Sequence, residues 1–137
     1  MIRAVLDTNI VVSALLFEGV ASRLVPGWQQ GRITLLVSKA LLDEYLRVFH
    51  YPKFRLTTVE VRHLVYGELL PFVTPVKVAR TPRVLRSDPA DNHVLACALA
   101  GAADLVVTGD HHLLALRRYR TIPIVPLSAF LQQLGIS

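Results

Sequence analysis

Four acidic residues lie where a strand is expected to end, or where a helix is expected to begin or turn toward the core: Asp7, Glu44, Asp91 and Asp110. Asp7 and Asp110 each follow a short apolar run that is typical of a buried strand. In an open parallel sheet, ligands bind beyond the carboxyl ends of the strands. Two acids at such ends and two more from helices would therefore form a carboxylate pocket. Because clustered like charges are unfavourable, such a pocket calls for a hard divalent cation, and its oxygen ligands suit Mg²⁺ or Mn²⁺.

Asp7 lies in the segment Leu6-Asp7-Thr8-Asn9, between an expected strand and an expected helix. Any one of its three polar residues could cap the helix by accepting a backbone N–H. Three such residues in a row exceed that need, which favours a functional role for Asp7. We expect that Asn9 could hold the Asp7 carboxylate by a hydrogen bond and that Thr8 is structural.

Glu44 and Asp91 are interpreted from the helical periodicity of their neighbours. At about 100° per residue, Glu44 lies on the flank of an apolar face, whereas Asp43 points the opposite way and reads as a surface charge. An acid beside the core is costly unless it is satisfied, so Glu44 is expected to face a site. Asp91 has a competing interpretation, because Asp88, Pro89 and Asp91 resemble a helix-capping arrangement. Since Asp91 shares the apolar side of its helix, we expect Asp88 to cap and Asp91 to bind metal.

Asp110 follows Thr108, whose hydroxyl could hydrogen-bond a neighbouring carboxylate or a phosphate. The alternative is an ordinary Gly-Asp turn. Asp104 starts the same strand and is expected at the opposite edge of the sheet. Zinc is a less favoured metal, because zinc sites prefer mixed nitrogen and sulfur ligands and adjacent histidines rarely reach one ion. The histidines considered for zinc are His93, His111 and His112.

The elements that must position these residues alternate between β-rich runs and helical segments. Strands are predicted at 2–6, 33–37, 72–78, 104–108 and 122–125. Helices are predicted at 9–16, at 20–31, from a cap at Ser38 to Phe49, from Thr57 or Thr58 to Pro71, from Asp88 to Ala100, at 111–116 and at 127–134. Glu60 is placed for a capping box at the start of the fourth of these helices. Pro26 should kink or divide the second helix, and residues 79–87 read as a basic loop. This alternation implies an α/β fold with a mostly parallel sheet covered on both faces.

The composition predicts a single domain over residues 1–137, because this length supports one core and no repeat or linker divides it. Hydrophobic residues make up 53% of the chain, yet no stretch approaches the ~18 uninterrupted apolar residues of a membrane span. Met1 leads straight into a strand without signal-peptide architecture, so we expect a cytoplasmic protein. Cys97 is the only cysteine, which excludes an intramolecular disulfide, and it reads as a small buried hydrophobe.

The formal net charge of +5 makes this a basic chain around an acidic pocket. A positive field attracts a polyanion, and cations in the pocket could meet one of its phosphates. Arginine far outnumbers lysine, which suits bidentate phosphate contact, although genome base composition could produce the same bias. Two arginine clusters are candidates for phosphate contact, with a solvated surface face as the alternative. They are Arg83 and Arg86 before the third acid, and Arg117, Arg118 and Arg120 after the fourth.

These segments, taken together, resemble the PIN-domain nucleases. The resemblance rests on Leu6-Asp7-Thr8-Asn9, the inward-facing Glu44, the segment from Asp91 to Ala98, and Val107-Thr108-Gly109-Asp110. It covers nearly the whole chain in the expected order and is closest to the VapC-like toxin components of bacterial and archaeal toxin–antitoxin pairs. It implies a PIN-like three-layer αβα sandwich and a metal site at the strand ends. The residues it assigns to that site are Asp7, Glu44, Asp91 and Asp110, with Asn9 and Thr108 in support.

The resemblance also implies cleavage of single-stranded or structured RNA that depends on Mg²⁺ or Mn²⁺. One or two metal ions would polarise a phosphodiester and lower the pKa of a bound water, leaving 5′-phosphate and 3′-hydroxyl ends. The partners we expect are RNA, a cognate antitoxin that inserts a segment into the acidic groove, and a second copy of the chain. Homodimerisation is expected because the chain is so apolar, and residues 57–71 offer a helix face for it.

Three other functions compete with this one. A phosphatase could use Asp7 as a nucleophile, but that class usually has a second acid two residues later, where Asn9 stands. A phospho-receiver domain would need an acid pair on the first strand, which is absent. The chain could instead be a non-catalytic, basic RNA-binding or antitoxin-bound scaffold. A DNA flap nuclease is a variant of the nuclease interpretation.

Overall fold

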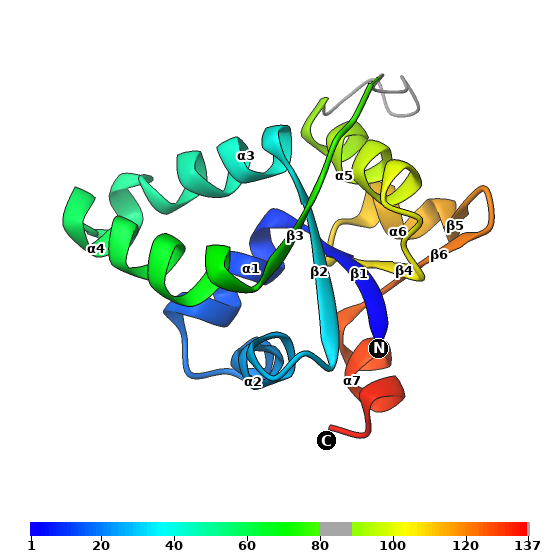
Figure 1. Ribbon diagram of the computed structural model, residues 1–137, viewed down its shortest axis with the longest axis horizontal. Coiled ribbons are helices and arrows are strands. Elements are labelled where there is room, and N and C mark those ends of the chain that lie inside the picture. Colours follow the sequence, from blue (N-terminus) through cyan, green and yellow to red (C-terminus); the bar gives the residue numbers. More distant parts are fainter. Residues whose placement is uncertain (80–88, 137) are drawn as a thin grey trace.

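The computed structural model describes residues 1–79 and 89–136, and within them the chain folds around one mixed sheet (Figure 1). The strands are β1 (Ile2–Leu6), β2 (Ile33–Ser38), β3 (Val73–Val76), β4 (Leu105–Val107), β5 (Arg118–Tyr119) and β6 (Ile122–Val125). Their order across the sheet is β3-β2-β1-β4-β6-β5, and every neighbouring pair is parallel except β5 with β6. The predicted mostly parallel α/β sheet is confirmed, with β1 near its centre.

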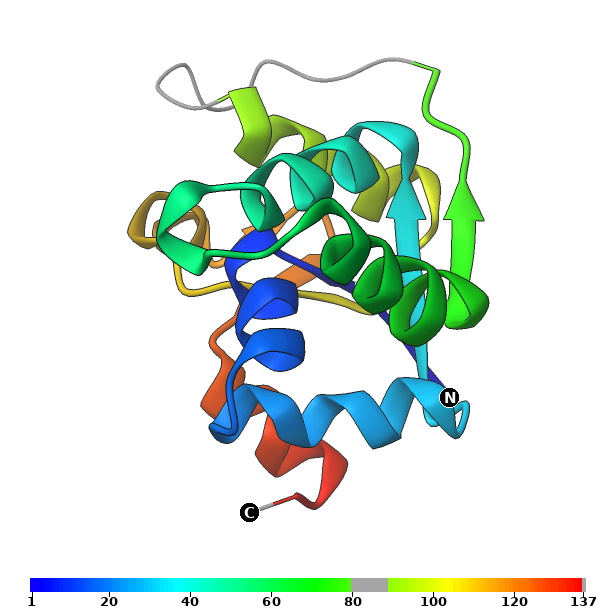
Figure 2. The same cartoon turned by 90° about the vertical axis from the view of Figure 1, so that its left-hand side faces the viewer.

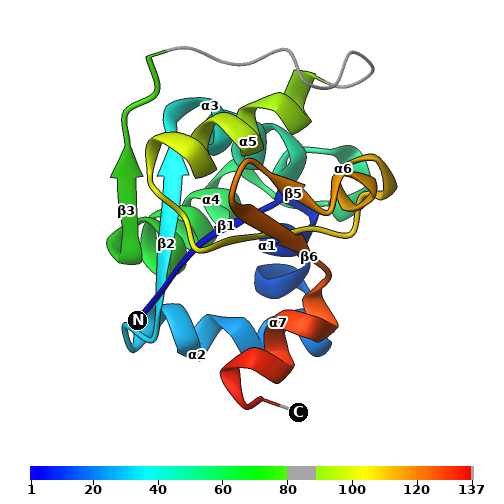
Figure 3. The same ribbon diagram turned by 90° about the vertical axis from the view of Figure 1, so that its right-hand side faces the viewer.

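Helices cover both faces of this sheet. They are α1 (Thr8–Leu16), α2 (Leu24–Gln29), α3 (Lys39–Phe49), α4 (Thr58–Arg62), α5 (Pro89–Ala100), α6 (His111–Leu116) and α7 (Leu127–Leu134). Figure 2 shows α1, α2, α3 and α4 together on one face, and Figure 3 shows α5 in front of the opposite face. This arrangement is the expected αβα sandwich. It follows from right-handed crossovers, which place helices on opposite faces when the strand order reverses direction at β1.

Local sequence signals set most helix starts. Ser38 caps α3, because its Oγ accepts the Leu41 N–H at 3.2 Å. Thr57 and Glu60 form the predicted capping box before α4: Thr57 Oγ1 accepts from Glu60 N at 3.1 Å, and Glu60 Oε1 accepts from Thr57 N at 2.9 Å. These hydrogen bonds satisfy N–H groups that have no partner inside the helix.

The structure corrects two predicted elements and adds one strand. The segment 20–31 divides into the 3-10 helix η1 (Val20–Arg23) and α2, but Pro26 is not at the break. It lies in the first turn of α2, where a missing N–H costs no hydrogen bond. The helix predicted to end at Pro71 is α4 followed by the π-helix η3 (His63–Leu69) and the 3-10 helix η4 (Leu70–Phe72). The two-residue strand β5 was not predicted, because it is too short to show an alternating pattern.

The core lies between the sheet and its helices, and the backbone just after α5 approaches the sheet closely. A Cβ added at Gly101, just after α5, would lie 3.0 Å from side-chain atoms of both Leu36 and Val76. Cys97 on α5 is fully buried, as predicted. In the described part of the chain, no single helix is long and apolar enough to cross a membrane. Only α1 taken with Val20–Gln29 passes by length and composition, and these two segments are bent by 87°.

Candidate functional site

The sheet brings together the strand ends that precede Asp7 and Asp110. Strands β1 and β4 are parallel neighbours, with Leu6 opposite Val107, so Asp7 and Thr108 follow the ends of adjacent strands. The Asp7 N–H donates to the Val107 carbonyl at 2.9 Å, which continues the ladder one residue beyond β1. The predicted convergence of these strand ends is therefore confirmed. Asp104 lies at the other end of β4, where its carboxylate accepts the Arg3 N–H at 2.8 Å.

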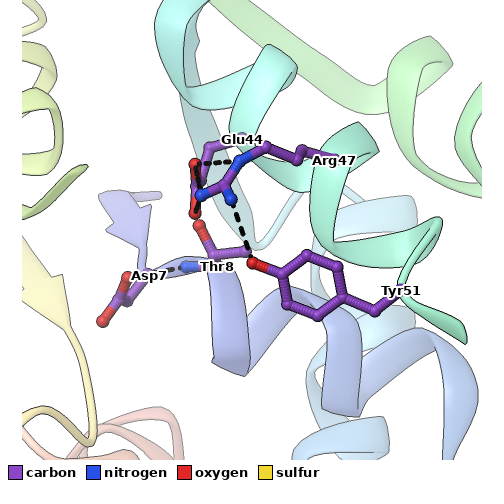
Figure 4. Close-up of polar contacts among 5 residues, drawn as sticks. All are labelled: Asp7, Thr8, Glu44, Arg47 and Tyr51. Carbon is purple, nitrogen blue, oxygen red and sulfur yellow. Dashed lines mark hydrogen bonds and ion pairs between the residues drawn. The ribbon is translucent and has the colours of Figure 1, made fainter. Parts of the chain in front are cut away.

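A fully buried hydroxyl connects Asp7 to Asp110. The Thr108 Oγ1 donates to Asp7 Oδ2 at 2.6 Å and accepts the Asp110 N–H at 3.0 Å. The other Asp7 oxygen, Oδ1, accepts the Thr8 N–H at 2.7 Å where Asp7 caps α1 (Figure 4). Asp7 is only 9% exposed. Both of its oxygens are thus held by hydrogen bonds, which orient the carboxylate.

The third and fourth acids come from the starts of α5 and α6. Asp91 lies in the first turn of α5 and is buried, so the expectation that it points toward the core side of its helix is confirmed. Asp110 caps α6, and its Oδ1 accepts the N–H groups of His112 at 2.8 Å and Leu113 at 3.2 Å. The predicted cap Asp88 lies outside the described residues.

Glu44 is engaged by a neighbouring arginine. Arg47, one turn later on α3, donates Nη2 to Glu44 Oε2 at 2.6 Å and to Oε1 at 2.7 Å (Figure 4). Its Nη1 donates to the Tyr51 hydroxyl at 3.0 Å. The hydrogen bonds that Arg47 donates to Glu44, and then the Glu44 charge, raise the pKa of Arg47, so the guanidinium is cationic at any working pH. The Glu44 side chain is 18% exposed and that of Arg47 is 59% exposed, so the arginine shields the acid from solvent.

All four predicted acids line one pocket of about 290 Å³. Its lining is polar and contains carboxylates, hydroxyls and two basic side chains. The lining residues are Asp7, Thr8, Asn9, Glu44, Arg47, Val48, Tyr51, Lys53, Asp91 and Asp110. The acids are far apart in the sequence and come from four different helix starts or faces, so their convergence is a product of the fold.

Phosphate contact by Arg117 and Arg118 stays a prediction, and other basic residues line this pocket. Arg117 and Arg118 are exposed and are not among its described lining residues. Arg83 and Arg86 lie outside the described residues. Arg47 and Lys53 line the pocket instead, and neither was predicted from the sequence. The spacing of three residues between Glu44 and Arg47 was a usable signal, because such residues are neighbours on a helix surface.

A buried tyrosine ties the helix that bears Glu44 to the strand that precedes Asp7. The hydroxyl of Tyr45 on α3 donates to the Leu6 carbonyl at 2.6 Å. Burial raises the pKa of Tyr45 well above its ordinary value, with smaller contributions from Cys97 and Asp7. The hydroxyl therefore keeps its proton and remains a donor. This contact fixes α3 against the end of β1 and so sets the position of Glu44 relative to Asp7.

The donor set fits a hard divalent cation by its chemistry. Carboxylate oxygens are the ligands that Mg²⁺ and Mn²⁺ prefer, and the pocket offers four of these groups. Among residues 1–79 and 89–136, no three His, Cys, Asp or Glu side chains lie close enough together to hold a metal ion. Glu44 is held by Arg47 in this conformation. Metal binding would therefore require carboxylate side chains to move toward one another.

Comparison with known proteins identifies the family of this chain. A family model described as a PIN domain matches residues 3–112, which is most of the chain and includes all four acids. A search of curated proteins gives no match. PIN domains are nuclease folds, and their members are typically metal-dependent hydrolases of phosphodiesters. The matched span, together with the mostly parallel sheet, shows that this chain belongs to the PIN-domain family.

Proposed function

We propose that the chain is a metal-dependent endoribonuclease that hydrolyses RNA phosphodiesters in the acidic pocket. The observation that carries this proposal is the convergence of Asp7, Glu44, Asp91 and Asp110 on one pocket of a PIN domain. The second support is charge. The pocket is acidic but has Arg47 and Lys53 in its lining, and the chain as a whole carries +5. An acidic pocket for cations within a basic molecule suits a polyanionic substrate.

The four carboxylates would hold one or two Mg²⁺ or Mn²⁺ ions, with Thr108 and Asn9 in support. A bound ion would supply Lewis-acid polarisation of the phosphodiester and activation of water. The chain must bring Glu44 to that ion by releasing it from Arg47. The freed guanidinium is then a bidentate donor beside the pocket, suited to a phosphate of the RNA.

The fixed part of the site is Asp7. Thr108 and the Thr8 N–H hold the two Asp7 oxygens before substrate arrives. The carboxylate is therefore already oriented and needs no reorganisation free energy during the reaction. Lys53 adds positive charge where the phosphate would lie. Hydrolysis adds water oxygen to phosphorus while the bond from phosphorus to the 3′ oxygen breaks. The 3′ oxygen takes a proton, leaving a 3′-hydroxyl end and a 5′-phosphate end.

The test incubates the purified protein with a mixed single-stranded RNA pool in EDTA, Mg²⁺ or Mn²⁺. We expect cleavage only with metal, and a loss of more than about a hundredfold in Asp7→Asn and Glu44→Gln, because even outer partners of metal ligands cost ~10–100-fold. Asp43→Asn is the matched control, since Asp43 is exposed on the same helix and is not among the described lining residues of the pocket. Mn²⁺ should raise the Tm of the wild type but not of Asp7→Asn. Equal cleavage by wild type and Asp7→Asn would refute the proposal.

For the biological role of this nuclease, we propose that the chain is the toxin of a toxin–antitoxin pair and acts in the cytoplasm. Its support is the sequence resemblance to the VapC-like group. Expression of the wild type should arrest growth, expression of Asp7→Asn should not, and a co-expressed antitoxin should reverse the arrest. A homodimer through residues 57–71 belongs to the same proposal, and exposed Val59 and Tyr66 in this segment support it. RNA binding without cleavage would favour the scaffold alternative, and hydrolysis of phosphomonoesters would favour the phosphatase.

A further inference from the structure

A second groove adjoins the acidic pocket on the face that bears α1. It has a volume of about 590 Å³ and is lined by residues of α1 and of the 3-10 helix η2 (Pro52–Phe54), which follows α3. Asn9 and Lys53 line both the groove and the acidic pocket. The two hollows are therefore neighbours that adjoin at these two side chains.

Aromatic side chains give this groove its character. Phe17, at the C-terminal end of α1, is 54% exposed and lies against Phe54, with ring centroids 6.3 Å apart and planes inclined by 56°. The Nζ atom of Lys53 is 5.1 Å from the centroid of the Phe54 ring. Leu16 and Leu56 add apolar walls. We call this feature, defined by Phe17, Phe54, Lys53 and Asn9, the aromatic groove.

An exposed Phe17 ring, packed against a half-buried Phe54 ring that has a lysine ammonium over it, offers a surface for a planar ligand. Ring faces bind planar apolar surfaces, and a lysine ammonium binds a phosphate. Unpaired RNA bases are recognised in this way, by stacking on aromatic side chains while cations follow the backbone. Asn9 and Ser13 supply an amide and a hydroxyl that can hydrogen-bond a base edge. The volume of the groove lies within the range of small-molecule sites, about 300–1,000 Å³.

We propose that the aromatic groove is a nucleobase subsite that stacks an unpaired base next to the phosphate held in the acidic pocket. The inference rests on the proposed ribonuclease function and deepens it, because it places a base-binding subsite beside the acidic pocket. A base within a duplex is already stacked and cannot enter the groove. Lys53 connects the two hollows, since it lines both and lies over Phe54. A second copy of the chain could cover an apolar groove, but the shared lining with the acidic pocket favours the nucleotide.

The test uses one RNA that the wild type cleaves at a mapped bond. Versions of this RNA carry an abasic nucleotide at each position flanking that bond, and kcat/KM is measured for each version. The protein variants are Phe17→Ala and Phe17→Ala combined with Phe54→Leu, which keeps apolar volume against the core. Val20→Ala is the matched control, since Val20 is 51% exposed but is not among the described lining residues of the groove. Circular dichroism confirms that every variant folds.

We expect one abasic position to lower kcat/KM of the wild type on the order of tenfold, chiefly through KM. The double variant should lose a similar factor on intact RNA and lose nothing further on that abasic RNA, because both changes remove the same contact. Val20→Ala should behave as the wild type. The test also compares the single strand with its duplex, which should be cleaved poorly.

Three results would overturn the inference. Additive losses from the abasic nucleotide and the double variant would show that they act at different places. Unchanged kcat/KM in the double variant, with a dimer converted to a monomer in sedimentation, would show that a second copy covers the groove. In both cases the wild type still cleaves RNA and the proposed function stands. Failure of the wild type to cleave any RNA with Mg²⁺ or Mn²⁺ would instead remove the proposed function, and this inference with it.

Discussion

Replacing Thr108 with valine isolates the hydroxyl that connects Asp7 to Asp110. Valine has nearly the same shape, so the change removes an oxygen without opening a large cavity. Thr108 is fully buried, and its Oγ1 both donates to Asp7 Oδ2 at 2.6 Å and accepts the Asp110 N–H at 3.0 Å. The variant therefore loses one hydrogen bond to a carboxylate and leaves one partly buried N–H without this acceptor.

The expected loss in the free energy of unfolding follows from these two bonds. A hydrogen bond to a charged group contributes about 1.5–3 kcal/mol, and a buried donor left without an acceptor costs about 1–3 kcal/mol. Because the Asp110 N–H is only partly buried, it can donate to water instead, which reduces the cost of losing its acceptor. We therefore expect Thr108→Val to lower the free energy of unfolding by about 2–4 kcal/mol. Thr108→Ser keeps the hydroxyl and loses one methyl group, so its cost should be about 1 kcal/mol.

The assay is urea unfolding in EDTA, followed by the fluorescence of Trp28. This is the only tryptophan in the chain and it is 2% exposed, so unfolding changes its surroundings strongly. Thr34→Val is the matched control: it makes the same substitution on β2, at a half-buried position away from the pocket. A second measurement compares Mn²⁺ affinity, which should fall in Thr108→Val and be restored in Thr108→Ser.

Three outcomes would refute this reasoning. If Thr108→Val were as stable as the wild type, the hydroxyl would not be a significant support for either acid. If Thr108→Ser were as unstable as Thr108→Val, packing of the methyl group rather than hydrogen bonding would account for the loss. Equal losses in Thr34→Val and Thr108→Val would likewise point to a general effect of valine in the sheet.

Two further predictions concern the support behind the pocket. Tyr45→Phe should lower the free energy of unfolding by about 1–3 kcal/mol, because the buried Leu6 carbonyl loses its donor, whereas Tyr66→Phe at an exposed position should change urea unfolding little. A destabilised Tyr66→Phe would contradict this. Burial raises the pKa of the Cys97 thiol from 9.0 to about 11, so the folded state binds that proton more tightly than the unfolded state. The resulting stabilisation of the folded state is complete below pH 9 and is lost as the pH rises through 11. The free energy of unfolding should therefore decline less over that range in Cys97→Ala than in the wild type, by on the order of 2 kcal/mol. Parallel pH profiles of urea unfolding for both proteins would disprove it.

Much of the fold was predictable because its signals are local. The capping box at Thr57 and the cap at Ser38 depend on residues three apart, and both were confirmed. The helix predicted at 127–134 has the observed bounds. Local patterns failed where the backbone departs from regular periods, as in the π-helix η3. They also failed for β5, which is a strand only because it pairs with β6.

The candidate site divides in the same way. Its acids were predictable, because an acid that follows a buried strand or lies beside a helix core is costly unless it caps a helix or binds a cation. Its cations were not, because an arginine or lysine on an amphipathic helix or turn resembles any surface charge. The spacing between Glu44 and Arg47 indicates that the two are neighbours on a helix, but only the fold places Arg47 and Lys53 at the acidic pocket. Arg117 and Arg118 are exposed and are not among its described lining residues.

The α/β class, the end of each central strand and the four acids at or near those ends could all be predicted from the chain without its structure. These features depend on periodicity, caps and strand-forming runs, which act over a few residues. Which side chains meet was settled by the packing of the whole molecule. Thr108 bonds Asp7 across 101 positions of sequence, and Phe17 of α1 lies against Phe54 of η2. Such contacts depend on the order of strands and the packing of helices, so no local pattern in the chain encodes them.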